Sequence, residues 1–159
     1  MSDYLVLTPE VREQAESWLD QLEAKVGVIE DGARQLSESE AASLRDALED
    51  VRSNTAFARA AFSGARSLTE LPSAYCSVPT HPSRELAILI HAAGEEFGGT
   101  PWPLIEHAKA TLEDPHRRPF LLVVGTVLAS VFTSLTQGVW NDYPEYAPEG
   151  WNKPQPSEA

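Results

Sequence analysis

The chain has a single cysteine, Cys76, among its 159 residues. One cysteine excludes a disulfide within the chain and a zinc site built from cysteines. The first residues are followed by neither a basic stretch nor a long apolar one, so no secretory signal peptide is expected and the protein is predicted to be cytoplasmic. A complete glycine-rich phosphate loop is also missing, because Gly98 and Gly99 stand without the other residues of either phosphate motif.

Basic residues are scarce: 12 lysines and arginines stand against 24 aspartates and glutamates, for a formal net charge of −12. An acidic surface repels phosphate, so nucleic acid is not an expected ligand. The same surface attracts basic partners over a distance. The imbalance is largest in residues 1–62, which hold 13 acidic and 6 basic side chains.

Charged side chains are missing altogether from residues 120–140, although 23% of the chain is charged. A helix of this length could cross a bilayer, because about 20 apolar residues span a hydrocarbon core of roughly 30 Å. Its polar side chains recur at helical spacing and form one thin stripe, made of Thr126, Ser130, Thr133, Ser134 and Gln137. Such a stripe is typical of a central bundle helix, with the stripe facing solvent or a groove. We predict an apolar core helix over 120–140, with a single membrane span as an alternative.

Two amphipathic helices are predicted in the N-terminal part. Thr8 and Pro9 are typical of a helix start, and Gly27 marks the expected end of this first helix. Its apolar stripe is Val11, Ala15, Trp18, Leu22 and Val26. After a short connection, Ser37 and Glu40 have the spacing of a capping box that opens the second helix. The second stripe is Ala41, Leu44, Leu48, Val51, Thr55, Ala58 and Phe62.

The second stripe alternates spacings of three and four over its whole length. Such a regular seam favours a near-parallel helical neighbour. The first helix shares the period, so we expect the two to form an antiparallel hairpin. The alternative is a seam for a second chain, which would make the protein a homo-oligomer.

Residues 63–83 show neither a helical nor a strand period. A connection of this length inside a compact domain is usually functional or mobile. It contains Cys76, Ser77 and His81, which are the candidates for covalent catalysis. No orienting group or oxyanion element is visible beside them, so no catalysis is predicted here.

Two shorter helices follow. Ser83 is expected to cap the first of them, which has Leu86, Leu89, Ile90, Ala93 and Phe97 as its stripe and ends at the two glycines 98 and 99. Residues 100–103 open the second, with Leu104, Ile105, Ala108 and Leu112 facing inward. Asp114 and Pro115 are expected to end it.

These elements predict a single all-α domain over residues 1–140. About five helices are expected, with the hairpin and the two shorter helices packed around the core helix 120–140. Residues 141–159 are rich in proline and aromatic residues and should form an extended tail. Tyr143, Tyr146 and Trp151 could be recognition anchors, although packing back on the bundle is favoured because exposed aromatic side chains lower solubility.

Arg84 and His91 are seven residues apart, two helical turns, and so lie on one face of their helix. This spacing resembles the R-x4-6-H motif of HEPN-type helical ribonucleases. The resemblance covers eight residues and implies an arginine that orients phosphate and a histidine that handles the chemistry of the 2′-hydroxyl. At the position after the arginine, that family tends to have another polar residue, often Asn, whereas this chain has Glu85.

Carboxylates and imidazoles on facing helices can form metal sites in bundles. His91 and Glu95 are four residues apart, and Glu106 lies next to His107. Adjacent side chains diverge by about 100° on a helix and cannot easily share one ion. An exposed ion pair is the simpler interpretation, so no metal and no cofactor is expected.

The predicted function is protein binding without catalysis. Acidic helical proteins of this size commonly act as inhibitors, immunity proteins or adaptors of basic partners, and complementary charge gives such pairs fast association. The expected binding residues are those of the acidic helix face and of the tail: Glu13, Glu16, Asp20, Glu23, Tyr143, Tyr146 and Trp151. The competing hypothesis is a ribonuclease that uses Arg84 and His91.

Overall fold

The computed structural model describes residues 4–68, 81–99 and 101–150, apart from the side chains of residues 95–99. All regular structure in these ranges is helical, which confirms the predicted all-α class. The five longer helices are α1 (Pro9–Leu36), α2 (Glu38–Phe62), α3 (Arg84–Gly99), α4 (Trp102–Thr111) and α5 (Asp114–Val131). A π-helical turn, η2 (Phe132–Thr136), leads from α5 into α6 (Gln137–Asp142), and a 3₁₀ turn, η3 (Pro144–Tyr146), follows.

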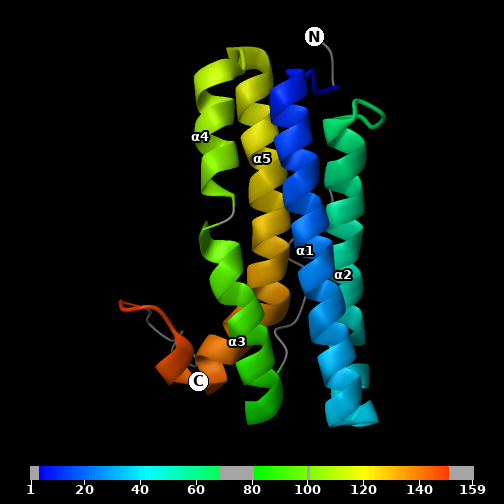
Figure 1. Ribbon diagram of the computed structural model, residues 1–159, viewed down its shortest axis with the longest axis vertical. Helices are drawn as coiled ribbons and strands as arrows, with labels where there is room; N and C mark the ends of the chain where they lie inside the picture. The colour runs from blue at the N-terminus through cyan, green and yellow to red at the C-terminus, as the bar shows by residue number, and fades with distance from the viewer. Residues whose placement is uncertain (1–3, 69–80, 100, 151–159) are drawn as a thin grey trace, which may run out of the picture.

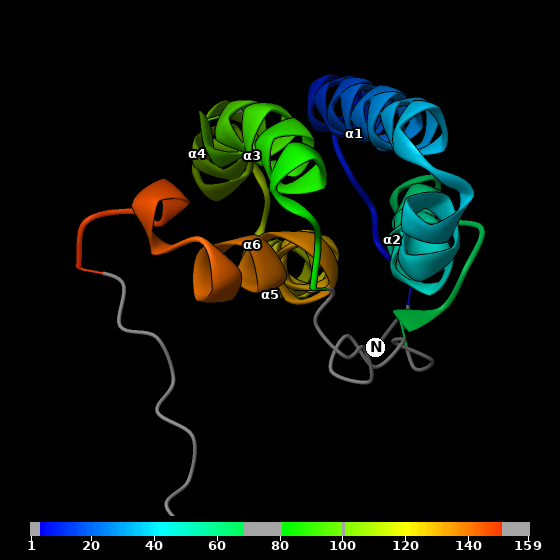
Figure 2. The same ribbon diagram turned by 90° about the horizontal axis from the view of Figure 1, so that it is seen from below.

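The helices form a four-sided bundle in which α3 and α4 together make one side (Figure 1). Seen from the end, α1, α2, α5 and the α3–α4 pair occupy the four corners (Figure 2). α1 packs on α2, α3 and α4, and α2 packs on α1 and α5. Neighbouring sides run antiparallel (Figure 1), so the predicted hairpin of the first two helices is present.

The topology explains the long connection between α2 and α3. These two helices lie on a diagonal and run in the same direction, so α2 ends at one end of the bundle and α3 begins at the other (Figures 1 and 2). Parallel helices in a bundle require a long crossover connection in place of a tight turn. Cys76 and Ser77 belong to this connection and lie outside the described residues.

The predicted end of the first helix near Gly27 is wrong, because α1 continues to Leu36. Ile29 and Ala33 extend its apolar stripe and are fully buried. At Gly32 a Cβ atom would lie 2.4 Å from Cδ2 of Leu89 on α3. This glycine therefore serves close helix packing, and tertiary contacts override the weak intrinsic helix propensity of glycine.

The start of α2 is as predicted. The Ser37 hydroxyl accepts a hydrogen bond from the backbone N–H of Glu40 at 3.0 Å. Six of the seven predicted stripe residues are fully buried: Leu44, Leu48, Val51, Thr55, Ala58 and Phe62. Since α2 packs on both α1 and α5, its seam is filled within the chain.

Two predictions about the segment 120–140 are corrected. The segment lies at a corner of the bundle, diagonal to α1, and not at its centre (Figure 2). On its outer side Leu122 is 54% exposed, whereas Phe120 and Val123 are buried. The helix also begins earlier, at Asp114, with Pro115 in its first turn, where proline is tolerated. The pair Asp114 and Pro115 thus opens a helix and does not close the preceding one.

The polar stripe of this segment was expected to face solvent or a groove, but its middle faces the core. Ser130 and Ser134 are fully buried. The Ser130 hydroxyl donates to the backbone carbonyl of Val127 at 2.7 Å, and that of Ser134 donates to Oδ2 of Asp50 on α2 at 3.1 Å. Each buried hydroxyl therefore has a partner, as buried polar groups require.

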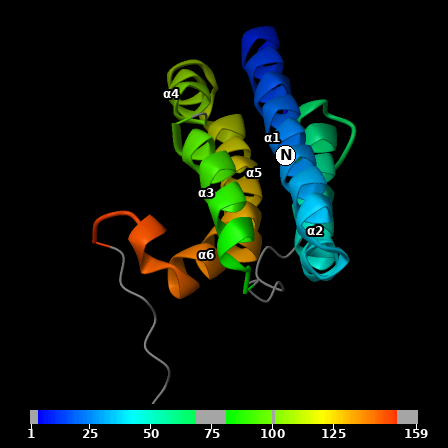
Figure 3. The ribbon, with the colours of Figure 1, turned by 60° about the horizontal axis from the view of Figure 1, so that its bottom comes forward.

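The continuous helical stretch Asp114–Asp142 is long and apolar enough to cross a membrane, and 44% of its most apolar window is buried within the bundle. One helix of this kind is weak evidence for a span, because the core helix of a soluble protein meets the same criteria. The chain leaves this stretch through η3, which projects beside α3 and α6 (Figure 3). The expected extended tail therefore begins with a helical turn.

Candidate functional site

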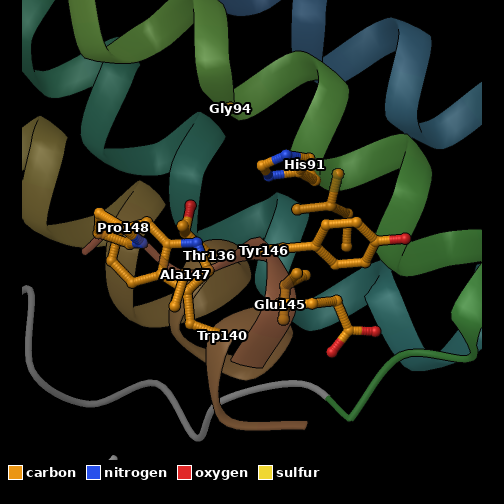
Figure 4. A pocket seen from close by; sticks show the side chains of 10 residues that line it. His91, Gly94, Thr136, Trp140, Glu145, Tyr146, Ala147 and Pro148 are labelled. Carbon is orange, nitrogen blue, oxygen red and sulfur yellow. The ribbon is translucent and has the colours of Figure 1, made fainter. Parts of the chain in front are cut away.

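A cavity of about 470 Å³ lies where α3, the end of the η2–α6 stretch and the η3 segment meet (Figure 4). Its volume is within the usual range for ligand pockets, roughly 300–1,000 Å³. Most of its lining is apolar or aromatic, with a few polar groups between: Ile90, His91, Gly94, Thr136, Val139, Trp140, Glu145, Tyr146, Ala147 and Pro148. This composition is typical of a binding pocket.

The π-helical turn forms one wall of the pocket. Its last residue, Thr136, faces Gly94 on α3, where an added Cβ would lie 3.9 Å from the threonine hydroxyl. The extra residue in a π turn changes which side chains face inward, and such turns are frequent at functional sites. Here Leu135 stays buried in the bundle, while Thr136, Val139 and Trp140 line the pocket.

Arg84 and His91 lie on the same side of α3, as their spacing predicts, and both contact the C-terminal segment. Arg84 Nη1 donates to Glu145 Oε1 at 2.8 Å, and its guanidinium lies 4.9 Å from the ring centroid of Tyr143. The ring of His91 stacks on Tyr146 with 4.7 Å between centroids. The two residues of the ribonuclease hypothesis are therefore engaged by the chain's own C-terminal segment.

The ion pair at the edge of the pocket shifts two pKa values. The hydrogen bond from Arg84 holds the pKa of Glu145 below its usual value. The hydrogen bond to Glu145 in turn raises the pKa of Arg84, against the opposing effect of burial. Both side chains are at least half exposed, so the pair orients the segment more than it stabilises the fold.

The two tail tyrosines pack on the bundle. The Tyr143 hydroxyl donates to the backbone carbonyl of Pro82 at 3.0 Å, and the rings of Tyr143 and Tyr146 lie 6.4 Å apart. This is the arrangement that the sequence favours over free recognition anchors. A role for these tyrosines in partner binding stays a prediction, and Trp151 lies outside the described residues.

The predicted acidic residues of α1 fall into two pairs. Asp20 and Glu23 contact Arg59 of α2 at 2.8 and 3.2 Å. Burial lowers the pKa of Arg59, but its hydrogen bond to Asp20 and the nearby charge of Glu23 outweigh this effect and raise it. Glu13 and Glu16 form no ion pair within the described part of the chain.

The candidate metal residues that the structure describes are His91, Glu106 and His107, whereas the side chain of Glu95 lies outside the described part of the chain. Among the residues that the structure describes, no group of three or more His, Cys, Asp or Glu side chains could hold a metal ion. Glu106 lies 3.4 Å from Lys109, whereas Nδ1 of His107 lies 2.8 Å from Gln14 on α1.

His81, the candidate base of the long connection, lies 3.0 Å from Asp142.

Comparison with protein-family models, with curated proteins and with solved structures finds no match to this chain. Two features of the surface are candidates for a functional role: the acidic face of α1 and the pocket beside α3.

Sequence reasoning did not find the pocket as a site. It singled out His91 and Tyr146, but the pocket also needs Thr136, Trp140 and Pro148, which lie on other segments. Each of these residues has an ordinary structural role when it is considered alone. Only the packing of α3 against the C-terminal segment brings them together.

Proposed function

We propose that this protein is a non-enzymatic binding module for a basic protein, acting as an inhibitor, immunity protein or adaptor. The observation that carries the proposal is the row of acidic side chains on α1. Its four members follow one another at spacings of three, four and three residues, which places them on one face of the helix: Glu13, Glu16, Asp20 and Glu23.

The row has an excess of negative charge even after its internal ion pairs are counted. Four carboxylates stand against one guanidinium, that of Arg59. Arg59 pairs with Asp20 and Glu23, while Glu13 and Glu16 have no ion-pair partner among the described residues. Ordered charge of one sign steers an oppositely charged protein and accelerates its association.

The test is to purify the protein from a lysate of its source organism, identify what accompanies it, and reconstitute the pair from pure components. Titration calorimetry then compares the wild type with Glu13→Lys/Glu16→Lys. The matched control is Asp46→Lys/Glu49→Lys on α2, whose side chains are exposed and make no ion pair within the described residues. Both variants change the net charge by the same amount.

The proposal expects a basic partner whose affinity falls steeply with added salt. The variant on α1 should weaken binding by about tenfold or more, whereas the control on α2 should change it much less. A partner that is not basic, an affinity independent of salt, or equal losses in both variants would contradict the acidic-face proposal.

The ribonuclease hypothesis makes a different prediction for the same protein. Arg84 would have to leave Glu145 before it could bind a phosphate, which weighs against this hypothesis. If the wild type cleaved RNA and folded His91→Ala did not, the enzyme hypothesis would replace the one proposed here. A protein that aggregates without detergent in light scattering would favour the membrane alternative.

A further inference from the structure

The pocket beside α3 is lined by the large rings of Trp140 and Tyr146, by the imidazole of His91, which stacks on one face of Tyr146, and by one carboxylate, that of Glu145. No lysine or arginine is among its lining residues. The face of an aromatic ring attracts a cation, tryptophan most strongly, and the attraction grows when the site excludes water. The lining therefore suits a positively charged group better than an anion.

The charged residues near the pocket also favour a cation over an anion. Residues 120–150 contain three acidic side chains, Asp142, Glu145 and Glu149, and no lysine or arginine. Two of these have basic partners at or just before the start of α3: Asp142 contacts His81, and Glu145 contacts Arg84. The C-terminal wall of the pocket thus contributes acidic side chains and no basic ones.

The chain itself shows how the C-terminal segment binds a guanidinium. Arg84 lies over the ring of Tyr143 and donates to Oε1 of Glu145. A carboxylate has about four acceptor sites on its two oxygens. Glu145 can therefore accept hydrogen bonds from a second cation on the side of the pocket.

We infer that this pocket binds an organic cation, the side chain of an arginine or lysine that the partner inserts. The aliphatic stem would lie along Ile90 and Pro148, and the charged head would stack on Trp140 or Tyr146 beside Glu145. The source of the cation, a basic partner protein, rests on the proposed function. A free quaternary ammonium compound has the same chemistry, and the test separates these two sources.

The test uses small probes and the full chain. Nα-acetyl-L-arginine N-methylamide and the corresponding lysine derivative are titrated into ¹⁵N-labelled protein, and the indole N–H signal of Trp140 is followed, assigned through Trp140→Phe. The neutral control is the citrulline derivative, which has nearly the shape of arginine without its charge. Choline represents the free ammonium compounds.

The arginine or lysine derivative should shift the Trp140 signal with a Kd on the order of 1 mM, as expected for one side chain. Citrulline should bind at least about tenfold more weakly, since it lacks the charge that the rings and Glu145 attract. Equal binding of citrulline, or no shift with either cation at about 50 mM, would overturn the inference. Choline that binds tenfold more tightly than both derivatives would overturn the assignment to a partner side chain.

Two variants separate a direct role of Glu145 from a structural one. Glu145→Gln and Arg84→Gln remove the same ion pair, so any loosening of the segment affects both. Glu145→Gln should weaken binding of the arginine derivative about fivefold or more, whereas Arg84→Gln should leave it equal or stronger, because the carboxylate is released for the probe. Equal weakening in both variants would show that the ion pair acts only on structure and would overturn the role of Glu145.

The outcomes for the pocket and for the proposed function are distinguishable. If the cationic probes fail while partner affinity still depends on Glu13 and Glu16, this inference is wrong and the binding function stands. If the cationic probes bind but no basic partner is found, the pocket is a cation site and the proposed function is wrong.

Discussion

The N-terminal hairpin and the C-terminal half of the bundle are built in different ways. In the hairpin, α1 and α2 are uninterrupted, each begins at a side-chain cap, and ion pairs link the two, including Arg59 to Asp20 and Arg52 to Glu30. The C-terminal half is interrupted between α3 and α4, contains a proline within α5, and passes through the π turn η2. Its last turn is held by aromatic contacts and by the ion pair of Arg84 with Glu145.

The difference corresponds to two kinds of surface. The hairpin presents acidic side chains along one face of α1, and charge of one sign attracts an oppositely charged partner over a distance. The irregular half forms the cavity, because the breaks let α3, η2 and η3 converge from different directions. If both proposals hold, the hairpin would attract the partner and the pocket would hold one of its side chains.

The largest expected effect comes from breaking the contact between the halves. Phe62 of α2 and Phe120 of α5 are fully buried, with ring centroids 5.1 Å apart. Phe120→Ala should lower the free energy of unfolding by about 3–5 kcal/mol, because it leaves a cavity where the halves meet. Urea unfolding followed by circular dichroism measures this loss.

The matched control is Leu122→Ala on the same helix, where the side chain is 54% exposed. It should change the free energy of unfolding by less than about 0.5 kcal/mol, as surface substitutions usually do. Similar losses in the free energy of unfolding for both variants would mean that the Phe120 side of α5 does not face the core.

A smaller effect is expected within α1, where two glycines have different surroundings. Nothing lies within 4 Å of a Cβ at Gly27, whereas at Gly32 it would lie 2.4 Å from Leu89 of α3. Gly27→Ala should stabilise the protein by up to about 1 kcal/mol through helix propensity. Gly32→Ala should instead destabilise it by up to about 1 kcal/mol, because the end of the Leu89 side chain must shift to admit the methyl group.

Thermal unfolding of the two variants checks this difference in sign. The double variant Gly32→Ala/Leu89→Ala tests whether the contact with Leu89 causes the loss. Because Leu89→Ala removes the obstructing atoms, the changes in the free energy of unfolding of the two single variants should not add up to that of the double variant. Two alanine variants with equal effects would show that Gly32 is not a packing position between the hairpin and α3.

The smallest effect is a local response to pH at the end of the irregular half. Because Arg84 lowers the pKa of Glu145, the ion pair is complete above the usual glutamate pKa and is lost as the pH falls through the lowered value. The contact of η3 with α3 should therefore loosen in acid, while the hairpin stays unchanged. NMR titration of the Glu145 carboxyl and of the Tyr146 ring measures the midpoint.

Arg84→Gln provides the control for this titration. The titration midpoint of Glu145 should rise toward that of an exposed glutamate, because the hydrogen bond from Arg84, which does most to lower its pKa, is gone. An unchanged midpoint in Arg84→Gln would show that the ion pair does not persist in solution.

Local signals in the sequence determined the helical class and several helix starts. Thr8, Ser37 and Ser83 each accept a backbone N–H of the turn that follows, as their positions predict. The apolar stripe of α2 is also predicted correctly. Both kinds of signal, helix caps and hydrophobic periodicity, depend on residues within a few turns of one another.

Tertiary structure decided the length of α1, the corner position of α5 and the pocket. Gly32 continues the helix because Leu89 packs against it, and Ser134 faces inward because Asp50 of α2 lies opposite. The pocket needs three segments that are distant in the sequence. Periodicity states which side of a helix is apolar, but the neighbour that covers this side is fixed only when the whole bundle packs.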